Sequence, residues 1–160
     1  MKCTALALIF ILVMGRTIPG RGQSGNKATA RYYFEEVVNR QDLKGLSKVF
    51  ADSFVVHVLL DSTETKKSIA DQADFLRYFF KAFPDVHYSI GDVLESDNRI
   101  AMRVIFSGTH NGEFWGYPPP GNHIKYLSEI FFFRFKRGKV EELWVQLDLY
   151  NLFRQLKNSS

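Results

Sequence analysis

Four long segments of strand character follow one another in the second half of the chain, and they restrict the fold more than any other feature. Turn signals separate them, such as Ser96-Asp97-Asn98 and the Gly- and Pro-rich run 111–122. Strands of this length joined by short turns are typical of an antiparallel meander that curls. The segments cover residues 86–94, 99–109, 123–135 and 140–148.

The first half of the chain has helical spacing instead. Apolar residues recur at helical intervals in residues 27–38, 43–50 and 69–83, and Pro84 ends the last of these. A β-rich run, 53–60, lies between the second and third helices, and the polar residues 61–67 after it are expected to form a loop. Helices followed by long antiparallel strands predict an α+β fold, a cone-shaped curved sheet with the N-terminal helices packed on one face.

The last strand segment alternates strictly, so its side chains fall on two faces. Leu143, Val145 and Leu147 share one face. The opposite face is a polar row around an aromatic residue, which is typical of a pocket wall. An ordinary strand with one buried and one wet face remains the alternative. The polar row contains Glu142, Trp144, Gln146 and Asp148.

The first 25 residues are read as a signal peptide and leader. Lys2 precedes the apolar run 5–14, and a Gly-rich stretch follows to Gly25. Residues 26–157 then form a single domain and residues 158–160 a tail. We expect the protein to be secreted or periplasmic, with an uncleaved anchor as the alternative.

The charge balance gives little reason to expect a nucleic-acid partner. The net charge is +4, but three of the 21 Lys and Arg residues lie in the leader, so 18 basic residues face 17 acidic ones in the domain. Cys3 is the only cysteine, and the four histidines are scattered singly along the sequence. We therefore expect no disulfide in the domain and no metal site.

Five motifs together resemble the SnoaL-like family, whose founding members are polyketide cyclases and which includes ester cyclases. The resemblance covers the chain from about Asn26 to Leu156. It implies the nuclear-transport-factor-2-like fold, an α+β cone, in agreement with the pattern. The motifs are Ala82-Phe83-Pro84-Asp85, Gly108-Thr109-His110-Asn111-Gly112-Glu113-Phe114, Pro118-Pro119-Pro120-Gly121, Phe133-Arg134-Phe135 with Gly138-Lys139-Val140, and Trp144-x-x-x-Asp148 leading to Leu152-Phe153-Arg154-Gln155-Leu156.

The resemblance implies acid/base catalysis by Asp148 without metal or cofactor, because an Asp on the last strand does this work in the cyclases. A carboxylate in an apolar pocket has a raised pKa and can accept a proton from carbon next to a carbonyl. Gln146 and Trp144 are predicted to donate hydrogen bonds from the same face, and His110 or His57 to lie across the cone. The alternatives are that Asp148 caps the following helix and that His57 is an ordinary core or rim histidine.

Other candidates are less specific. Trp115, in an aromatic loop, is expected either to cover an apolar ligand or to plug the end of the core. Glu129, the acidic residue of a strand rich in phenylalanine, is also predicted to bind the ligand. This chain departs from the cyclases at Leu143, where His is common. Polyketide cyclases work beside their synthases in the cytoplasm. An exported member of the family is therefore not expected to share their substrate.

Three functions therefore stay open. The first is an exported cyclase or isomerase acting on a small, largely apolar carbonyl compound, and the second is a binding module that uses the same pocket without turnover. The third is a degenerate copy whose cavity is filled by the phenylalanines at 131, 132, 133 and 135. We also expect a homodimer that pairs through the outer sheet face, formed by the apolar row Leu143, Val145 and Leu147 together with Ile130 and Phe132.

Overall fold

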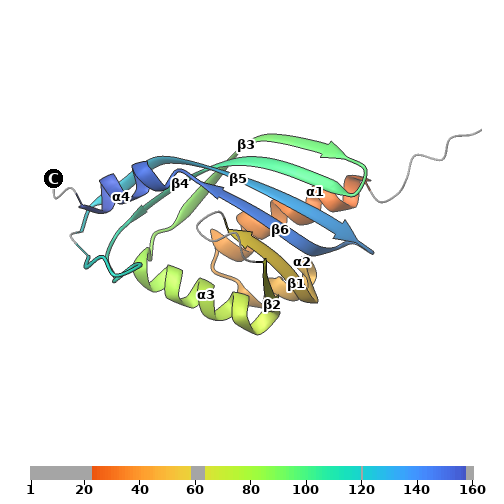
Figure 1. The fold of residues 1–160 in the computed structure, drawn as a ribbon, viewed down its shortest axis with the longest axis horizontal. Helices are drawn as coiled ribbons and strands as arrows, with labels where there is room; N and C mark the ends of the chain where they lie inside the picture. The colour runs from red at the N-terminus through yellow and green to blue at the C-terminus, as the bar shows by residue number, and fades with distance from the viewer. Residues whose placement is uncertain (1–22, 59–63, 120, 158–160) are drawn as a thin grey trace, which may run out of the picture.

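The protein is built on one curled six-stranded sheet (Figure 1). The structure is a computed structural model that describes residues 23–58, 64–119 and 121–157. The strand order is β2-β1-β6-β5-β4-β3. The strands are β1 (Phe50–Val58), β2 (Glu64–Ser68), β3 (His87–Ser96), β4 (Arg99–Thr109), β5 (His123–Lys136) and β6 (Lys139–Leu147). The helical elements are α1 (Gln23–Tyr32), η1 (Tyr33–Val38), η2 (Leu43–Gly45), α2 (Leu46–Val49), α3 (Ile69–Ala82) and α4 (Leu149–Lys157).

The predicted meander of the second half is confirmed. Strands β3 to β6 pair antiparallel with their sequence neighbours, and β1 then adds parallel to β6. Residues 64–67, expected as loop, belong to β2 and pair with β1, because an edge strand can consist of polar residues when one side faces water. The α+β fold with helices on one face of a curved sheet is therefore as predicted.

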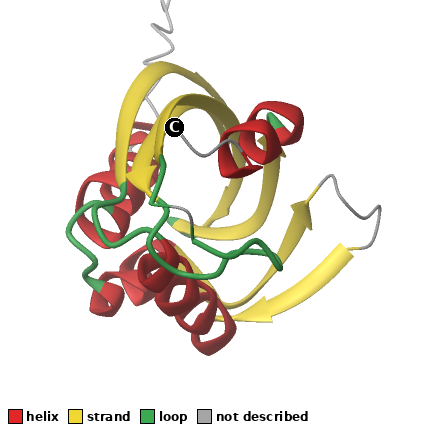
Figure 2. Cartoon of the chain, turned by 90° about the vertical axis from the view of Figure 1, so that its left-hand side faces the viewer, coloured by secondary structure: helices red, strands yellow, loops and turns green. Residues whose placement is uncertain are grey.

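Helices α1, α2 and α3 lie on the concave side of the sheet, whereas α4 lies apart from them at one end of the sheet, next to β5 (Figure 1 and Figure 2). Helix α3 begins at a capping box, in which Ser68 and Asp71 each bind the other's backbone N–H, and it ends just before Phe83 and Pro84. Core aromatic side chains fill the space beneath the sheet, among them Phe34, Phe83 and Phe133, each with at most 1% of its surface exposed.

The first helix changes its winding where it meets the core. After α1 the chain forms the π-helical turn η1, in which the Asn39 N–H donates to the Phe34 carbonyl five residues earlier at 2.9 Å. The wider turn buries four of its six residues, Tyr33, Phe34, Val37 and Val38. Such turns are frequent at functional sites.

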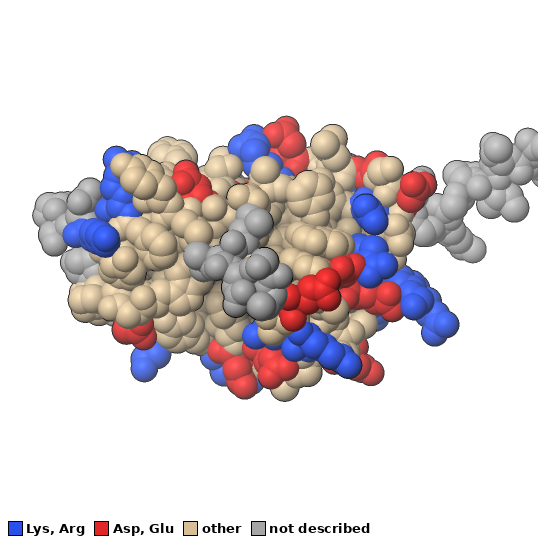
Figure 3. Space-filling view, in the orientation of Figure 1, with Lys and Arg blue, Asp and Glu red and all other residues tan. Residues whose placement is uncertain are grey.

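The predicted leader falls largely outside the described residues, which begin at Gln23. No helix in the described part of the chain is long and apolar enough to cross a membrane. In the view of Figure 3, Lys/Arg and Asp/Glu side chains are mixed along the lower edge and at the right, and no stripe of one sign dominates this face.

Candidate active site

A cavity of about 310 Å³ lies between the concave side of the sheet and the helices. Its walls are mostly aromatic and aliphatic, and they come from all six strands, η1, α3, α4, Phe83 and the loop at 114–115. This volume is at the small end of the range for ligand pockets. Among the four phenylalanines suspected of filling the space, Phe131 lines the wall and Phe132 is 48% exposed, so the degenerate, filled cavity is wrong.

A carboxyl group lies at the deep end of this cavity. Glu129 is 4% exposed, and the Tyr88 hydroxyl donates to its two carboxyl oxygens at 3.2 and 3.4 Å. Burial raises the pKa of Glu129 from 4.5 to about 8, and the hydrogen bond from Tyr88 lowers it only in part. A carboxyl of this kind exchanges its proton near neutral pH.

A second polar pair lies in the same wall. Gln72 Nε2 donates to the Tyr33 hydroxyl oxygen at 3.0 Å, and both residues line the cavity. Burial raises the pKa of Tyr33, which the Gln72 hydrogen bond lowers and the nearby charge of Glu129 raises further. Tyr33 therefore stays neutral and keeps a hydroxyl proton to donate.

Local structure explains why these groups meet. Strand β5 alternates buried and more exposed positions from Leu127 onward, and its inward row includes Glu129 and Phe131. In the sheet, Glu129 lies between Val104 of β4 and Leu147 of β6. The π-helical turn brings Tyr33 beneath this strand.

The prediction that the polar face of β6 forms the pocket wall is wrong. Leu143, Val145 and Leu147 line the cavity, whereas Trp144 and Gln146 lie on the outer side. Alternation shows which side chains share a face. It does not show which face the helices cover, and the apolar row is the one that turns inward here.

His57 and Trp144 lie together on this outer side. Their rings stack at 4.8 Å with an interplanar angle of 4°, and His57 Nε2 lies 2.8 Å from Glu142 Oε1. Arg134 forms an ion pair with the other carboxyl oxygen of Glu142. His57 therefore takes part in a cluster on the outer face and does not lie across the cavity.

Asp148 is exposed and lies outside the cavity wall. Its Oδ1 accepts from the Asn151 N–H at 3.0 Å, at the beginning of α4. Asp148 therefore caps α4, which is the alternative to catalysis that the sequence left open.

His110 is fully buried but does not line the cavity. Its ring stacks on Phe83 at 5.4 Å, and within the described residues neither ring nitrogen has a hydrogen-bond partner of good geometry. Burial lowers the pKa of His110, and the backbone of Gly112 offsets this in part. The motif around it closes the end of α3, because the Asn111 and Gly112 N–H groups both donate to the Ala82 carbonyl.

Trp115 and Glu129, both predicted to bind ligand, do line the cavity, although ligand contact itself stays a prediction. Five polar residues of the wall were missed: Tyr33, Thr65, Lys67, Gln72 and Tyr88. Gln72 had a signal, because it lies four residues before Leu76 on the apolar stripe of α3.

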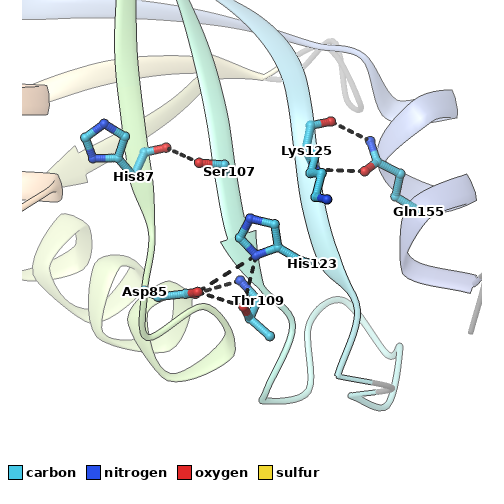
Figure 4. A network of polar contacts seen from close by, with 7 residues as sticks. All are labelled: Asp85, His87, Ser107, Thr109, His123, Lys125 and Gln155. Atoms are coloured by element: carbon cyan, nitrogen blue, oxygen red, sulfur yellow. Dashed lines mark hydrogen bonds and ion pairs between the residues drawn. The ribbon is translucent and has the colours of Figure 1, made fainter. Parts of the chain in front are cut away.

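A separate polar cluster lies on the surface (Figure 4). The Asp85 carboxylate accepts from the Thr109 N–H and hydroxyl, both at 2.6 Å, and His123 Nδ1 lies 3.0 Å from the same hydroxyl. Partial burial tends to raise the pKa of Asp85, but the Thr109 bonds outweigh it and lower the pKa. Nearby, Gln155 binds the Lys125 backbone twice and so fastens α4 to β5. These bonds join the residue just before β3 to the end of β4 and the start of β5, and they join β5 to α4.

No cluster of three or more His, Cys, Asp or Glu side chains that could hold a metal ion occurs in the part of the chain that is described.

Several solved structures have the same fold. A candidate SnoaL-like polyketide cyclase from Jannaschia sp. CCS1 is 19% identical with a TM-score of 0.78, over 88% of this chain and 95% of that one. AclR, a candidate hydroxylase from Streptomyces galilaeus, is 28% identical with a TM-score of 0.73, over 84% and 96%. IdmH, a candidate polyketide cyclase from Streptomyces antibioticus, is 23% identical with a TM-score of 0.70, over 83% and 99%.

No curated protein sequence matches this chain closely enough to count as a relative. The family model for SnoaL-like polyketide cyclases, however, matches residues 28–156, which is nearly the whole described domain. Together with the shared fold, this match supports a cyclase-type function. The chain belongs to the SnoaL-like polyketide cyclase family.

Proposed function

We propose that this protein is a cofactor-free cyclase or isomerase that acts on a small, largely apolar carbonyl compound, with Glu129 as its acid and base. One observation carries the proposal: a buried carboxyl with a pKa of about 8 lies at the deep end of an apolar cavity. Catalytic carboxyls are tuned toward neutral pH in this way. Asp148, the acid/base predicted from the sequence, is exposed at a helix start, so the role passes to Glu129.

The chemistry follows from the two polar pairs. Ionised Glu129 removes a proton from the carbon next to the substrate carbonyl, and the electron pair moves to the carbonyl oxygen as an enolate. The Tyr33 hydroxyl, held by Gln72, donates a hydrogen bond to that oxygen. In an aldol closure the enolate carbon attacks a second carbonyl, and protonated Glu129 returns the proton to the new alkoxide. In an isomerisation it returns the proton to carbon.

The Tyr33–Gln72 pair presents a free donor in either orientation of the amide. If Gln72 donates, the tyrosine keeps its own proton. If the amide is turned over, the tyrosine donates to Gln72 and the amide N–H groups are free. Two wall groups therefore have distinct tasks, since Glu129 moves the proton and the Tyr33–Gln72 pair steadies the negative oxygen.

The test is hydrogen–deuterium exchange at the carbon next to the carbonyl of 1-tetralone, followed by proton NMR. We expect the protein to accelerate exchange over buffer and Glu129→Gln to abolish the acceleration, because an amide cannot accept the proton. Asp148→Asn is the matched control and should exchange as the original protein does. The proposal fails if Glu129→Gln exchanges at the original rate, or if Asp148→Asn loses the activity.

The second candidate is a binding module that holds the same class of ligand without turnover. The aromatic walls favour it, because they bind apolar molecules whatever Glu129 does. A cavity that binds 1-tetralone but never accelerates its exchange would support this function.

We also propose that the protein is exported, to the cell exterior or the periplasm, on the basis of the basic start and apolar run of residues 2–14. Mass spectrometry of the protein made in its own host would show a mature chain that begins before or near Gly25. An intact Met1 in the purified protein would refute cleavage.

The proposal of a homodimer rests on the outer face of the sheet, where only Ile130 and Phe132 of the predicted residues are exposed. Leu143, Val145 and Leu147 turn inward. On the outer side an apolar row crosses four paired strands, with Leu94 at 71% exposure and Phe132 at 48%. This row contains Leu94, Ala101, Phe132 and Trp144.

Phe132→Glu tests the dimer by sedimentation. We expect it to yield monomers, whereas Tyr150→Glu, at a more exposed site on α4, should leave the dimer intact. A monomeric original protein, or a Phe132→Glu variant that stays dimeric, would refute the proposal.

A further inference from the structure

The two ends of the cavity differ in exposure, which gives it a direction. At the deep end Tyr33, Tyr88 and Glu129 are each at most 8% exposed. At the other end Phe75 is 41% exposed and Thr65 is also exposed, although both line the cavity. The mouth therefore opens between β2 and the first turns of α3.

The mouth carries a cation. Lys67 of β2 lines the cavity on the same side of the strand as Thr65, and it is half-buried. It is the only basic residue in the cavity wall among the residues that the structure describes. The deep end has a carboxyl and neutral hydroxyl and amide groups, so the positive charge lies at the mouth alone.

Among the described residues, no acidic side chain pairs closely with Lys67. Within the described residues its ammonium forms no ion pair at 4.0 Å or less. It lies near enough to Asp71 to help lower the pKa of that carboxyl, after the larger effect of the hydrogen bonds from Ser68. Those bonds already occupy the Asp71 carboxylate in the cap of α3. The ammonium is therefore available to an anionic group that enters the mouth.

We propose that Lys67 binds the anionic end of the ligand, so that the substrates are apolar carbonyl compounds that also carry a carboxylate. This deepens the proposed function, because it rests on the same cavity and places the reacting carbonyl at the deep end. Strands β2 and β5 are three strand spacings apart, about 14 Å along the curved sheet. The apolar body of the ligand spans this interval between the ammonium and Glu129.

The physical reason is that the half-buried Lys67 ammonium pairs selectively with a carboxylate. A carboxylate at the mouth gains a charge-assisted hydrogen bond from the ammonium while its apolar body leaves water. A carboxylate at the deep end would face Glu129, and the repulsion would oppose ionisation of either group. An amphipathic acid therefore binds in one orientation, with the carboxylate outward.

The experiment uses a neutral fluorescent probe, N-phenyl-1-naphthylamine, and displaces it with decanoate or with 1-decanol, which lacks the charge. Both competitors are titrated against the original protein, Lys67→Met, Lys67→Arg and Lys66→Met. Lys66 is the matched control, because it directly precedes Lys67 in β2 and does not line the cavity. Binding of the neutral probe shows that each variant keeps its cavity.

We expect Lys67→Met to weaken displacement by decanoate about tenfold, the effect of losing one partly exposed charged hydrogen bond. Displacement by 1-decanol should not change. Lys67→Arg should keep the affinity for decanoate, since the charge remains, and Lys66→Met should change neither competitor. High salt should weaken the binding of decanoate and leave that of 1-decanol unchanged.

Three results would overturn the proposal. The first is that Lys67→Met loses affinity for decanoate and 1-decanol equally, and the second is that it loses no affinity for decanoate. The third is that decanoate fails to displace the probe from the original protein. None of them depends on turnover. The exchange of 1-tetralone, a neutral ketone, tests Glu129 separately, so failure of one proposal is distinguishable from failure of the other.

Discussion

Glu129→Gln should make the protein markedly more stable at alkaline pH, although it removes the proposed catalytic group. The pKa of Glu129 is raised from 4.5 to about 8 in the folded protein. The folded state therefore holds the proton more tightly than the unfolded chain does. The stability that this proton contributes is fully present below pH 4.5, and it is lost as the pH rises through about 8.

The size of the effect follows from the same shift. Each pKa unit corresponds to about 1.4 kcal/mol, so the carboxyl costs the folded state about 5 kcal/mol once it is fully ionised. At 4% exposure, solvent screens this cost little. The groups facing Glu129 are the hydroxyls of Tyr88 and Tyr33, whose pKa values burial also raises, so both stay neutral over this range.

The assay is urea unfolding, followed by tryptophan fluorescence, at intervals from pH 5 to pH 9. The difference in unfolding free energy between Glu129→Gln and the original protein removes contributions from all other groups. At pH 5 we expect the two proteins to agree within about 1 kcal/mol, because the Gln amide oxygen still accepts from Tyr88. By pH 9 the variant should be more stable by several kcal/mol.

A pH-independent difference would refute the reasoning. It would mean that Glu129 titrates at its ordinary pKa, and the buried acid/base would have to be abandoned. Asp148→Asn serves as the control, because it also replaces a carboxyl by an amide, at an exposed position outside the cavity wall.

Three further predictions concern single contacts. Tyr88→Phe should move the pKa of Glu129 still higher, because the hydroxyl bond lowers it, and carbon-13 NMR of the carboxyl would show the shift; a lower pKa would contradict this. Trp144→Ala should lower the unfolding free energy by about 1–2 kcal/mol through loss of the stack on His57, with unchanged binding of N-phenyl-1-naphthylamine. Weakened probe binding would mean that Trp144 contributes to the pocket after all. Asp148→Ala should cost about 1 kcal/mol by removing the cap of α4 and leave 1-tetralone exchange unaltered, as thermal unfolding and NMR would test.

Several features of the fold could be predicted because they depend on local pattern. Alternation and turn residues placed β4 at residues 99–109, as the structure has it, and helical spacing placed α3 to within one residue of its end at Ala82. The polar strand β2 could not be found this way. It is held by pairing with β1, and its own sequence has no apolar alternation.

The site was harder to predict, because a strand has two faces of equal periodicity. The sequence by itself determined that Leu143, Val145 and Leu147 lie together and that Trp144 and Gln146 lie opposite. Only the packing of the helices decided that the first row lines the cavity.

The meeting of Glu129, Tyr88, Tyr33 and Gln72 also depends on tertiary structure. These residues come from a strand, another strand, a π-helical turn and a helix, at positions 33 to 129 of the sequence. No local pattern relates such distant positions. The sequence supplied the carboxyl and the apolar residues, while the raised pKa arises only when the curled sheet and the helices exclude water around Glu129.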